Sequence, residues 1–255
     1  PKPAEYLDNA TFVNKDYETC QFTHLQKHDL NLVLQKRYAL LNWQQGSGKT
    51  AAAYHRAKYL LKFRKVRNVV ILAPAIAINM TWDAFLKTNK EQYRVIRTSK
   101  DLEDVPEGIF LIVSTSMLGK LKRGLARFIK LRNRKLCLVF DESDEITNPN
   151  SQRTKYVLCL FRRLKYKLLD TGTTTRNNIS ELYSQFELLY NNSVNMICRC
   201  DRIYRENKER EIESESNSYY GEPFPAFRGH VLFKACHCPG QGVRVRYREA
   251  EPGCL

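Results

Sequence analysis

The sequence predicts a doubly wound α/β domain with a mostly parallel sheet, followed by a less regular C-terminal extension. Apolar runs of strand length alternate with segments of helical period over most of the chain. Several of these runs are unbroken, as in parallel strands that are covered on both faces. A glycine-rich loop joins the first run to a helical segment. These three observations favour strand–helix repeats around a single sheet.

The alternation also predicts the order of the elements. We expect strands at residues 38–43, 68–74, 93–98, 109–115, 135–141 and 166–171, with helices at 24–36, 49–64, 76–89, 118–131, 150–163 and 178–190. Residues 1–22 show no strong period and are predicted to form an N-terminal tail. The pattern stops near Tyr190, where polar sequence of mixed charge follows. The predicted organisation is therefore a tail (1–22), an α/β domain (23–190) and an incomplete extension (191–255).

The composition excludes several classes of protein. With 255 residues, of which 43% are hydrophobic, the chain can bury a core and is not disordered throughout. The longest apolar stretch, residues 69–78, is about half as long as a membrane-spanning helix must be. No secretion signal stands at the N-terminus. We therefore expect an intracellular protein, cytoplasmic or nuclear, with no membrane partner.

The basic residues are clustered. The formal net charge is +15, residues 56–67 hold six basic and no acidic residues, and residues 120–135 hold eight basic and no acidic residues. Runs of this kind indicate a polyanionic partner, most often nucleic acid. The alternative is that each run is the solvated face of a helix.

The glycine-rich loop has the composition of a phosphate-binding loop. Gly46, Ser47, Gly48, Lys49 and Thr50 follow a predicted strand and begin a predicted helix. Glycines let backbone N–H groups turn toward phosphate oxygens at a helix N-terminus, the lysine reaches the β and γ phosphates, and the hydroxyl holds Mg²⁺. These residues therefore predict an ATP site.

Two residues near this loop qualify the prediction. Trp43 stands where the full loop pattern has its first glycine. His55 lies on the helix that follows the loop, and we expect it at the surface rather than in a functional role.

An acidic pair predicts the second half of the same site. The apolar run at residues 136–140 ends in Asp141 and Glu142. Open α/β sheets bind ligands at the carboxyl ends of their strands. Adjacent side chains point to different sides of the chain, so Asp141 can serve the Mg²⁺ while Glu142 faces the attacking water.

Taken in chain order, these segments resemble the first motor lobe of superfamily-two helicases, and most of all the Swi/Snf-type DNA translocases. The resemblance covers about residues 22–190 and depends on the order of residues 24–28, the phosphate loop, 69–74 with 82–85, 114–116, 141–149 and 171–178. It implies a RecA-like lobe of the P-loop NTPase class that uses ATP and Mg²⁺. It also implies that Gln26 contacts adenine, since an amide can pair with an adenine edge.

The resemblance further implies how the remaining segments act. Residues 69–74 and 82–85 would lie along the DNA backbone, residues 114–116 would contact a strand, and residues 171–178 would couple hydrolysis to movement. Ser143 and Asp144 replace the commoner Ala and His, and Thr174 stands where Pro is usual. None of these departures touches the metal or phosphate chemistry.

Nothing after Tyr190 resembles the second lobe of the family, which supplies arginine fingers. An arginine finger contributes about 10³–10⁵ in rate. We therefore expect a fragment that binds MgATP and hydrolyses it weakly. The missing lobe would be a partner, downstream in cis or on another chain in trans.

Four cysteines form two Cys-x-Cys pairs in the extension: Cys198, Cys200, Cys236 and Cys238. In an extended strand, residues i and i+2 share a face, so each pair could present two sulfurs to one zinc ion. The alternative is four ordinary thiols in a reducing compartment, since the usual spacing is Cys-x-x-Cys.

The function predicted first is the ATP-binding lobe of a DNA-dependent ATPase that translocates along duplex DNA, with salt-dependent binding through the basic runs. One alternative is a nucleotide-gated binding module inside a restriction or remodelling assembly. Another is an RNA-directed helicase. The extension of the acidic segment through residues 146–149 favours DNA.

Overall fold

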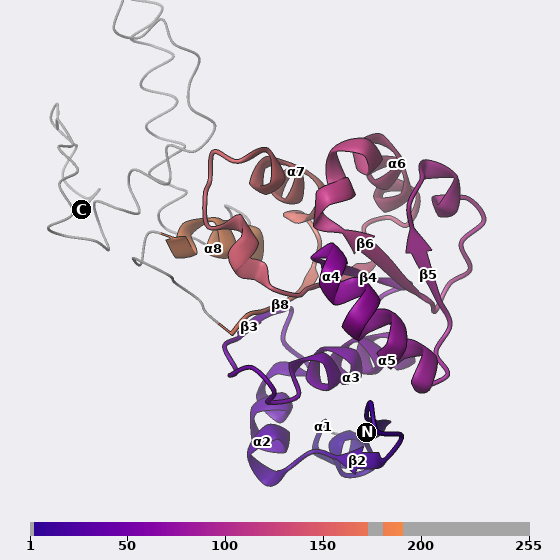
Figure 1. The fold of residues 1–255 in the computed structure, drawn as a ribbon, viewed down its shortest axis with the longest axis vertical. Coiled ribbons are helices and arrows are strands. Elements are labelled where there is room, and N and C mark those ends of the chain that lie inside the picture. The colour runs from indigo at the N-terminus through magenta and orange to yellow at the C-terminus, as the bar shows by residue number, and fades with distance from the viewer. Residues whose placement is uncertain (1–2, 173–180, 191–255) are drawn as a thin grey trace, which may run out of the picture.

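A six-stranded parallel sheet forms the centre of the computed structural model, which describes residues 3–172 and 181–190 (Figure 1). Its strands, in spatial order, are β3 (Tyr38–Leu41), β8 (Tyr166–Asp170), β7 (Leu136–Phe140), β4 (Asn68–Ala73), β6 (Phe110–Ser114) and β5 (Tyr93–Ile96). Every neighbouring pair is parallel. The carboxyl ends of all six strands therefore lie along one edge of the sheet.

Helices cover both faces of this sheet. On one face lie α2 (His24–Val33), α3 (Lys49–Lys62) and α5 (Asp83–Thr88), and on the other lie α6 (Leu118–Leu131), α7 (Gln152–Phe161) and α8 (Leu182–Tyr190) (Figure 1). The short α4 (Ala75–Ala77) leads through a π-helical turn, Ile78–Trp82, into α5. Among the described residues, no helix is long and apolar enough to cross a membrane. The predicted doubly wound parallel fold is confirmed.

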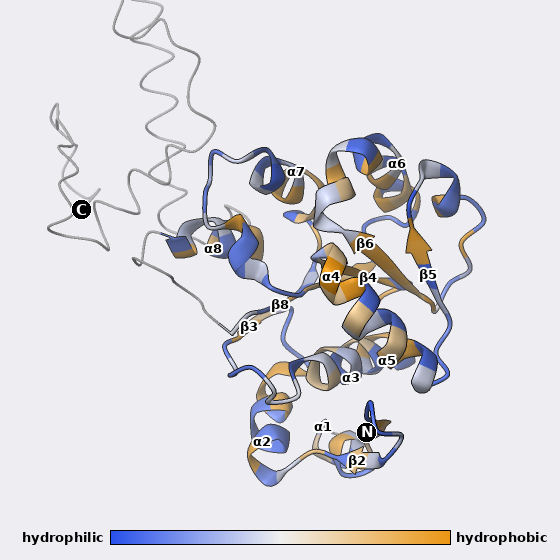
Figure 2. Cartoon of the chain, in the orientation of Figure 1, coloured by the Kyte–Doolittle hydropathy of each residue, from blue (hydrophilic) through white to orange (hydrophobic). Residues whose placement is uncertain are grey.

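The central strands form where the sequence is uninterruptedly apolar. Every residue of β4, β6 and β7 is buried, because helices cover both faces. In Figure 2 the arrows of β5 and β6 have hydrophobic colours, whereas the ribbon of α6 alternates between hydrophilic and hydrophobic colours. All six predicted strands and the helices between them are present, with ends that differ by a few residues.

The N-terminal segment is structured, contrary to the predicted tail. It contains α1 (Pro3–Asp8) and an antiparallel hairpin of β1 (Thr11–Val13) and β2 (Thr19–Gln21). Leu7 and Phe22 are 1% and 4% exposed within the cluster of buried residues that includes α3. Elements of three to six residues are too short to show a period, so their burial depends on contacts far away in the sequence.

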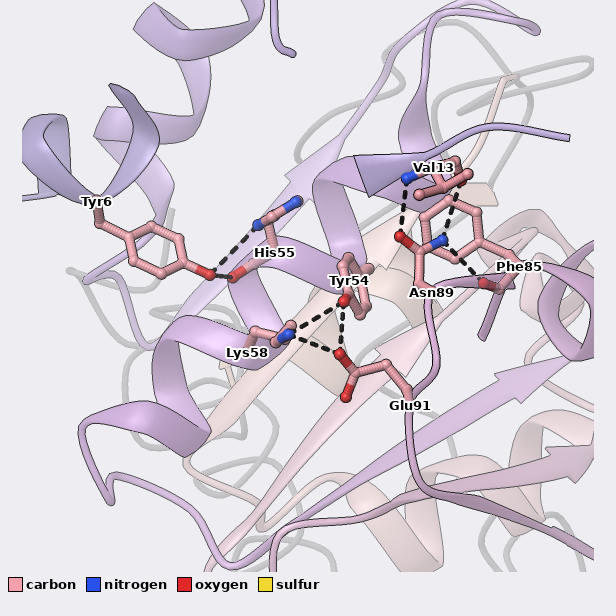
Figure 3. Close-up of polar contacts among 8 residues, drawn as sticks. All are labelled: Tyr6, Val13, Tyr54, His55, Lys58, Phe85, Asn89 and Glu91. Atoms are coloured by element: carbon pink, nitrogen blue, oxygen red, sulfur yellow. Dashed lines mark hydrogen bonds and ion pairs between the residues drawn. The ribbon is translucent and has the colours of Figure 1, made fainter. Parts of the chain in front are cut away.

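His55 is buried, so its predicted surface position is wrong (Figure 3). Its imidazole Nδ1 lies 3.3 Å from the Tyr6 hydroxyl, which also donates to the His55 carbonyl at 3.2 Å. Burial, assisted by the charge of Lys58, lowers the pKa of His55 to about 4. The covering residues come from the N-terminal segment, and local sequence around His55 contains no sign of them.

Arg56 is also buried, although it belongs to the first basic run. Its guanidinium is fully enclosed and donates to the carbonyl oxygens of Val33 (3.3 Å), Lys36 (2.9 Å) and Arg37 (3.3 Å). These carbonyls belong to the end of α2 and the segment that enters β3. Arg56 therefore joins α2 to α3 inside the protein and is not available to a polyanion.

Candidate nucleotide and magnesium site

Sheet order brings three segments together at the carboxyl edge. The glycine loop follows β3, the Asp141–Glu142 pair follows β7, and β8 lies between these two strands. The register places Leu41 of β3 opposite Asp170 of β8, and the Thr171 N–H donates to the Leu41 carbonyl at 3.2 Å. The loop and the acidic pair are therefore separated by only one strand, β8.

The loop has the backbone shape that its glycines allow. Gly46 and Gly48 have φ values of 79° and 85°, a region that disfavours side chains. The Ser47 N–H and hydroxyl both donate to the Gln44 carbonyl, at 3.2 and 2.6 Å. Gly48 is the N-cap of α3, and no side chain among the described residues caps this helix. The N–H groups of its first turn therefore remain able to bind an anion.

Lys49 lies between the loop and β8. Its ammonium donates to the Trp43 carbonyl at 3.2 Å, and a Cβ atom added to Gly172 would lie 3.4 Å from it. Trp43 thus contributes a backbone carbonyl, which any residue could supply, while its indole N–H donates to Asp29 on α2 at 3.1 Å. This explains how tryptophan replaces the first glycine of the loop pattern. Thr50 follows as the second residue of α3.

Gln26 holds α2 against the loop. Thr23 caps α2, and the Thr23 N–H donates to Gln26 Oε1 at 2.8 Å, which completes a capping box. Gln26 Nε2 donates to the Ser47 carbonyl at 2.9 Å. A Cβ atom added to Gly48 would lie 3.2 Å from Gln26 Nε2, so glycine at this position also makes room for Gln26. To bind an adenine edge with both amide atoms, Gln26 would have to release its hydrogen bonds to Thr23 and Ser47.

The acidic pair is held in two different environments. Asp141 is 9% exposed, and its Oδ2 accepts a 2.7 Å hydrogen bond from the indole of Trp82. Glu142 is half-buried and has a left-handed backbone, with φ 55°, which costs free energy in a non-glycine residue. Burial and the charges of Asp141 and Asp144 raise the pKa of Glu142. A raised pKa suits a carboxylate that takes up a proton.

Ser143 and Asp144, which depart from the helicase pattern, connect the acidic segment to its neighbours. The Ser143 hydroxyl donates to Gln185 Oε1 of α8 at 3.2 Å. The Thr171 hydroxyl donates to Asp144 Oδ1 at 3.3 Å. Ser143 and Asp144 are both buried, so these contacts lie inside the protein. They link the acidic segment to the end of β8 and to α8.

Asp170 is a site residue that the sequence analysis missed. Its side chain is fully buried at the end of β8, and its pKa is raised well above the usual range by burial and by the nearby carboxylate of Asp141. The available signal was a carboxylate at the end of an apolar strand, which is the same signal that identified Asp141. The structure thus brings Lys49 and Asp141 close enough for their charges to affect the pKa of both Glu142 and Asp170.

Other predicted segments differ in how far the structure describes them. Trp82 is fully buried, so it cannot itself contact a nucleic acid. The hydroxyls of Ser114 and Ser116 lie 2.8 Å apart after β6. Residues 173–178 lie outside the described residues. So do Cys198, Cys200, Cys236 and Cys238, and the described part of the chain contains no His/Cys/Asp/Glu cluster suited to a metal ion.

This arrangement fits a magnesium nucleotide. An uncapped helix N-terminus with two glycines of positive φ offers N–H donors, Lys49 adds a cation, and carboxylates stand one strand away. Phosphate groups need donors and positive charge, and Mg²⁺ prefers hydroxyl and carboxylate oxygens. Lys49, Thr50 and Asp141 are the residues that could hold such a ligand.

The parallel sheet and this edge define the first RecA-like lobe of a superfamily-two helicase. The chain belongs to the family described as the type III restriction enzyme, res subunit, which matches residues 15–176. Membership implies nucleotide hydrolysis with ATP and Mg²⁺ as the chemistry of the fold.

Individual relatives agree with this assignment. The chain is 27% identical over 173 residues to the ATP-dependent helicase FUN30 of Saccharomyces cerevisiae, covering 64% of this chain and 15% of FUN30. The SWI2/SNF2 ATPase core of Sulfolobus solfataricus in complex with dsDNA is 17% identical, with a TM-score of 0.55 over 70% of this chain and 37% of that one. The UvsW helicase of bacteriophage T4 is 14% identical, with a TM-score of 0.53 over 73% and 64%. These two structures share the fold, and the chain spans only part of each relative.

Proposed function

We propose that this chain is the ATP-binding lobe of a DNA-dependent ATPase that translocates along duplex DNA with a second lobe. The observation that supports this most is the meeting of the uncapped α3 N-terminus and Lys49 with Asp141 and Glu142 at one sheet edge. Residues 23–190 would form the lobe, and residues 191–255 an extension.

Each site residue has a proposed role. Lys49 and the loop N–H groups neutralise the phosphates, while Thr50 and Asp141 hold the Mg²⁺, which when bound offsets charge on the β and γ oxygens. Trp82 keeps Asp141 oriented through its 2.7 Å hydrogen bond. Glu142 orients the attacking water and accepts its proton. Gln26, at the end of α2 nearest the loop, contacts adenine.

Duplex DNA is the proposed partner for two reasons. The solved SWI2/SNF2 core with the same fold was determined with dsDNA bound. The chain also carries a formal net charge of +15, which favours a polyanion. Because an isolated first lobe lacks the arginines of the second, we expect the chain alone to hydrolyse ATP slowly.

The family match favours one alternative. The res subunit belongs to a restriction enzyme, so the chain could act as a nucleotide-gated module within such an assembly. In that case ATP would change its conformation, but duplex DNA would not accelerate hydrolysis.

The test uses three variants of the full chain. Lys49→Ala is expected to lose MgATP binding, measured by calorimetry. Glu142→Gln should keep binding but lose about 10²–10⁴ in hydrolysis rate, since it removes a general base. Glu103→Gln, which changes an exposed carboxylate away from the site, is the matched control. Turnover is measured with and without duplex DNA.

The outcomes separate the assignments. Full-rate turnover by Glu142→Gln would show that Glu142 is not the base. Unchanged MgATP binding by Lys49→Ala would contradict the nucleotide site itself. Binding without any stimulation by DNA, even when a second lobe is supplied, would favour the gated module.

A further inference from the structure

A groove of about 800 Å³ lies between α6 and α7, on the sheet face opposite α3. Of residues 3–172 and 181–190, six basic residues line it and no acidic residue does. Three belong to α6 and the turn after it, and three to α7 and its end: Lys122, Lys130, Arg134, Lys155, Arg162 and Arg163. The groove therefore has positive charge on both walls.

Most of these cations form no ion pair within the part of the chain that the structure describes. Arg162 pairs with Glu187 at 2.8 Å, but Lys130, Arg134, Lys155 and Arg163 make no ion pair with any described residue. Free cations on facing walls repel one another, so their proximity favours a bound anion. This is unlike the neighbouring Arg132, which pairs with Glu107 at 3.5 Å.

The groove runs along α6 and α7, from Lys122 and Lys155 near the carboxyl edge of the sheet toward the amino edge. Helix α6 connects the parallel strands β6 and β7, so it runs from the carboxyl edge of the sheet back to the amino edge. Lys130 is twelve residues beyond the start of α6 at Leu118, which is about 18 Å along the helix. Helix α7 connects β7 to β8 in the same sense, so Arg162 and Arg163 also lie toward the amino edge.

The length of the groove and the burial of its apolar residues favour a nucleic-acid strand over an acidic amphipathic helix as the ligand. Lys122 and Lys130 are eight residues apart on α6, which is about 12 Å along the helix. This distance matches roughly three phosphates along one strand of DNA. An acidic amphipathic helix would instead need free apolar surface. Ile129 and Leu158 on the floor are only 6% and 4% exposed, because they already pack within the protein. The floor therefore offers such a helix little area to bury.

We propose that the α6–α7 groove binds the phosphodiester backbone of nucleic acid, as a second contact surface outside the nucleotide site. The proposal rests on the proposed function for the identity of the ligand. It also names the residues that bind: Lys130, Arg134, Lys155 and Arg163 contact phosphates of a nucleic-acid segment that lies in the α6–α7 groove.

The first experiment measures binding of a labelled 30-base-pair duplex to the full chain by fluorescence anisotropy over a range of salt concentrations. The groove variant is Lys130→Gln, Arg134→Gln, Lys155→Gln and Arg163→Gln together. The matched control is Lys65→Gln, Lys87→Gln, Lys90→Gln and Lys100→Gln, which removes the same charge from exposed positions outside the groove. Thermal melting confirms that both variants fold.

Each phosphate contact contributes about 0.9 to the slope of log K against log salt. The groove variant is therefore expected to lower the magnitude of this slope by about 3–4 and the affinity at least tenfold. The control should change both by less than half as much. Equal losses in the two variants, or no loss in the groove variant, would overturn the proposal.

Cys159 provides a second, independent readout, because its exposed free thiol lines the groove. Bound duplex DNA should slow alkylation of Cys159 at least fivefold, followed by mass spectrometry of its peptide, while alkylation of Cys20 serves as the reference. Polyglutamate at the same charge concentration should protect it far less. Protection by polyglutamate but not by DNA would overturn the proposal in favour of an acidic protein.

The two proposals can fail separately. If the wild-type chain binds no duplex DNA at all, the proposed function fails together with this one. If it binds DNA but neither the groove variant nor Cys159 alkylation responds, only the groove assignment fails. Binding of MgATP, which depends on Lys49, is expected to be unchanged in the groove variant.

Discussion

Helices α3 and α6 have the same length, 14 residues, lie on opposite faces of the sheet and are both rich in basic residues. Their surroundings nevertheless differ. In α3, residues on all sides of the helix are buried, including His55 and Arg56. In α6, buried residues form a single stripe of five apolar side chains, and the cations face solvent. Similar charge in the sequence thus has two different outcomes.

The difference arises from what covers each helix. Helix α3 packs on the sheet, and α2 and the N-terminal segment cover its outer side. Two half-buried cations of the first basic run are paired, Lys58 with Glu91 at 2.6 Å and Arg67 with Glu107 at 3.3 Å. The exposed cations of this run, Lys62, Arg64 and Lys65, form no ion pair with a described residue. Helix α6 has no such outer layer among the described residues. Three members of the first run, Arg56, Lys58 and Arg67, are therefore held by contacts inside the protein, whereas most cations of the second run are exposed and available for binding.

The largest expected effect comes from Arg56→Met, which is predicted to lower the free energy of unfolding by about 3–5 kcal/mol. The substitution removes the enclosed guanidinium that donates to the carbonyls of Val33, Lys36 and Arg37, and with it the hydrogen bonds between α2 and α3. Urea denaturation measures the effect, with Lys62→Met on the exposed side of α3 as the control. A loss below about 1 kcal/mol would mean that Arg56 does not join α2 to α3.

An intermediate effect is expected for His55 and depends on pH. Its folded pKa is about 4, below the ordinary value of about 6.5, so the unfolded chain binds a proton that the folded chain does not. Stability should therefore fall as the pH drops from 6.5 to 4, by about 2 kcal/mol at pH 5.

The variant His55→Phe should lose this part of the acid sensitivity, as measured by urea unfolding at pH 5 and 7. His28→Gln, which changes an exposed imidazole on α2, should retain the wild-type dependence. Identical pH profiles for wild type and His55→Phe would show that His55 takes up its proton equally in both states.

The smallest effect is expected for Arg127→Met on α6. Arg127 is exposed and forms no ion pair with any described residue, so its replacement should change the free energy of unfolding by less than about 0.5 kcal/mol. The same substitution is thus expected to have a large effect on stability at Arg56 and almost none at Arg127. A change of several kcal/mol at Arg127 would remove the contrast between the two helices.

Local patterns predicted the elements well where they were long or strongly apolar. The runs that became β4, β6 and β7 are unbroken, and the stripe of α6 repeats with a helical period. The N-terminal hairpin was missed because its strands have three residues each. Asp170 ends an apolar strand and Asp141 directly follows one, but the position of Asp170 beside the loop depends on β3 and β7, which are far away in the sequence.

By itself, the sequence determined which segments after residue 22 are strands and helices, where the glycine loop turns, and that Asp141 and Glu142 follow a buried strand. These depend on local properties: residue period, backbone freedom at glycine and apolar runs. Only the tertiary structure decided that β8 lies between β3 and β7, that Asp170 meets Asp141, and which cations are buried. Burial and strand order depend on contacts between segments far apart in the chain, and no local pattern encodes them.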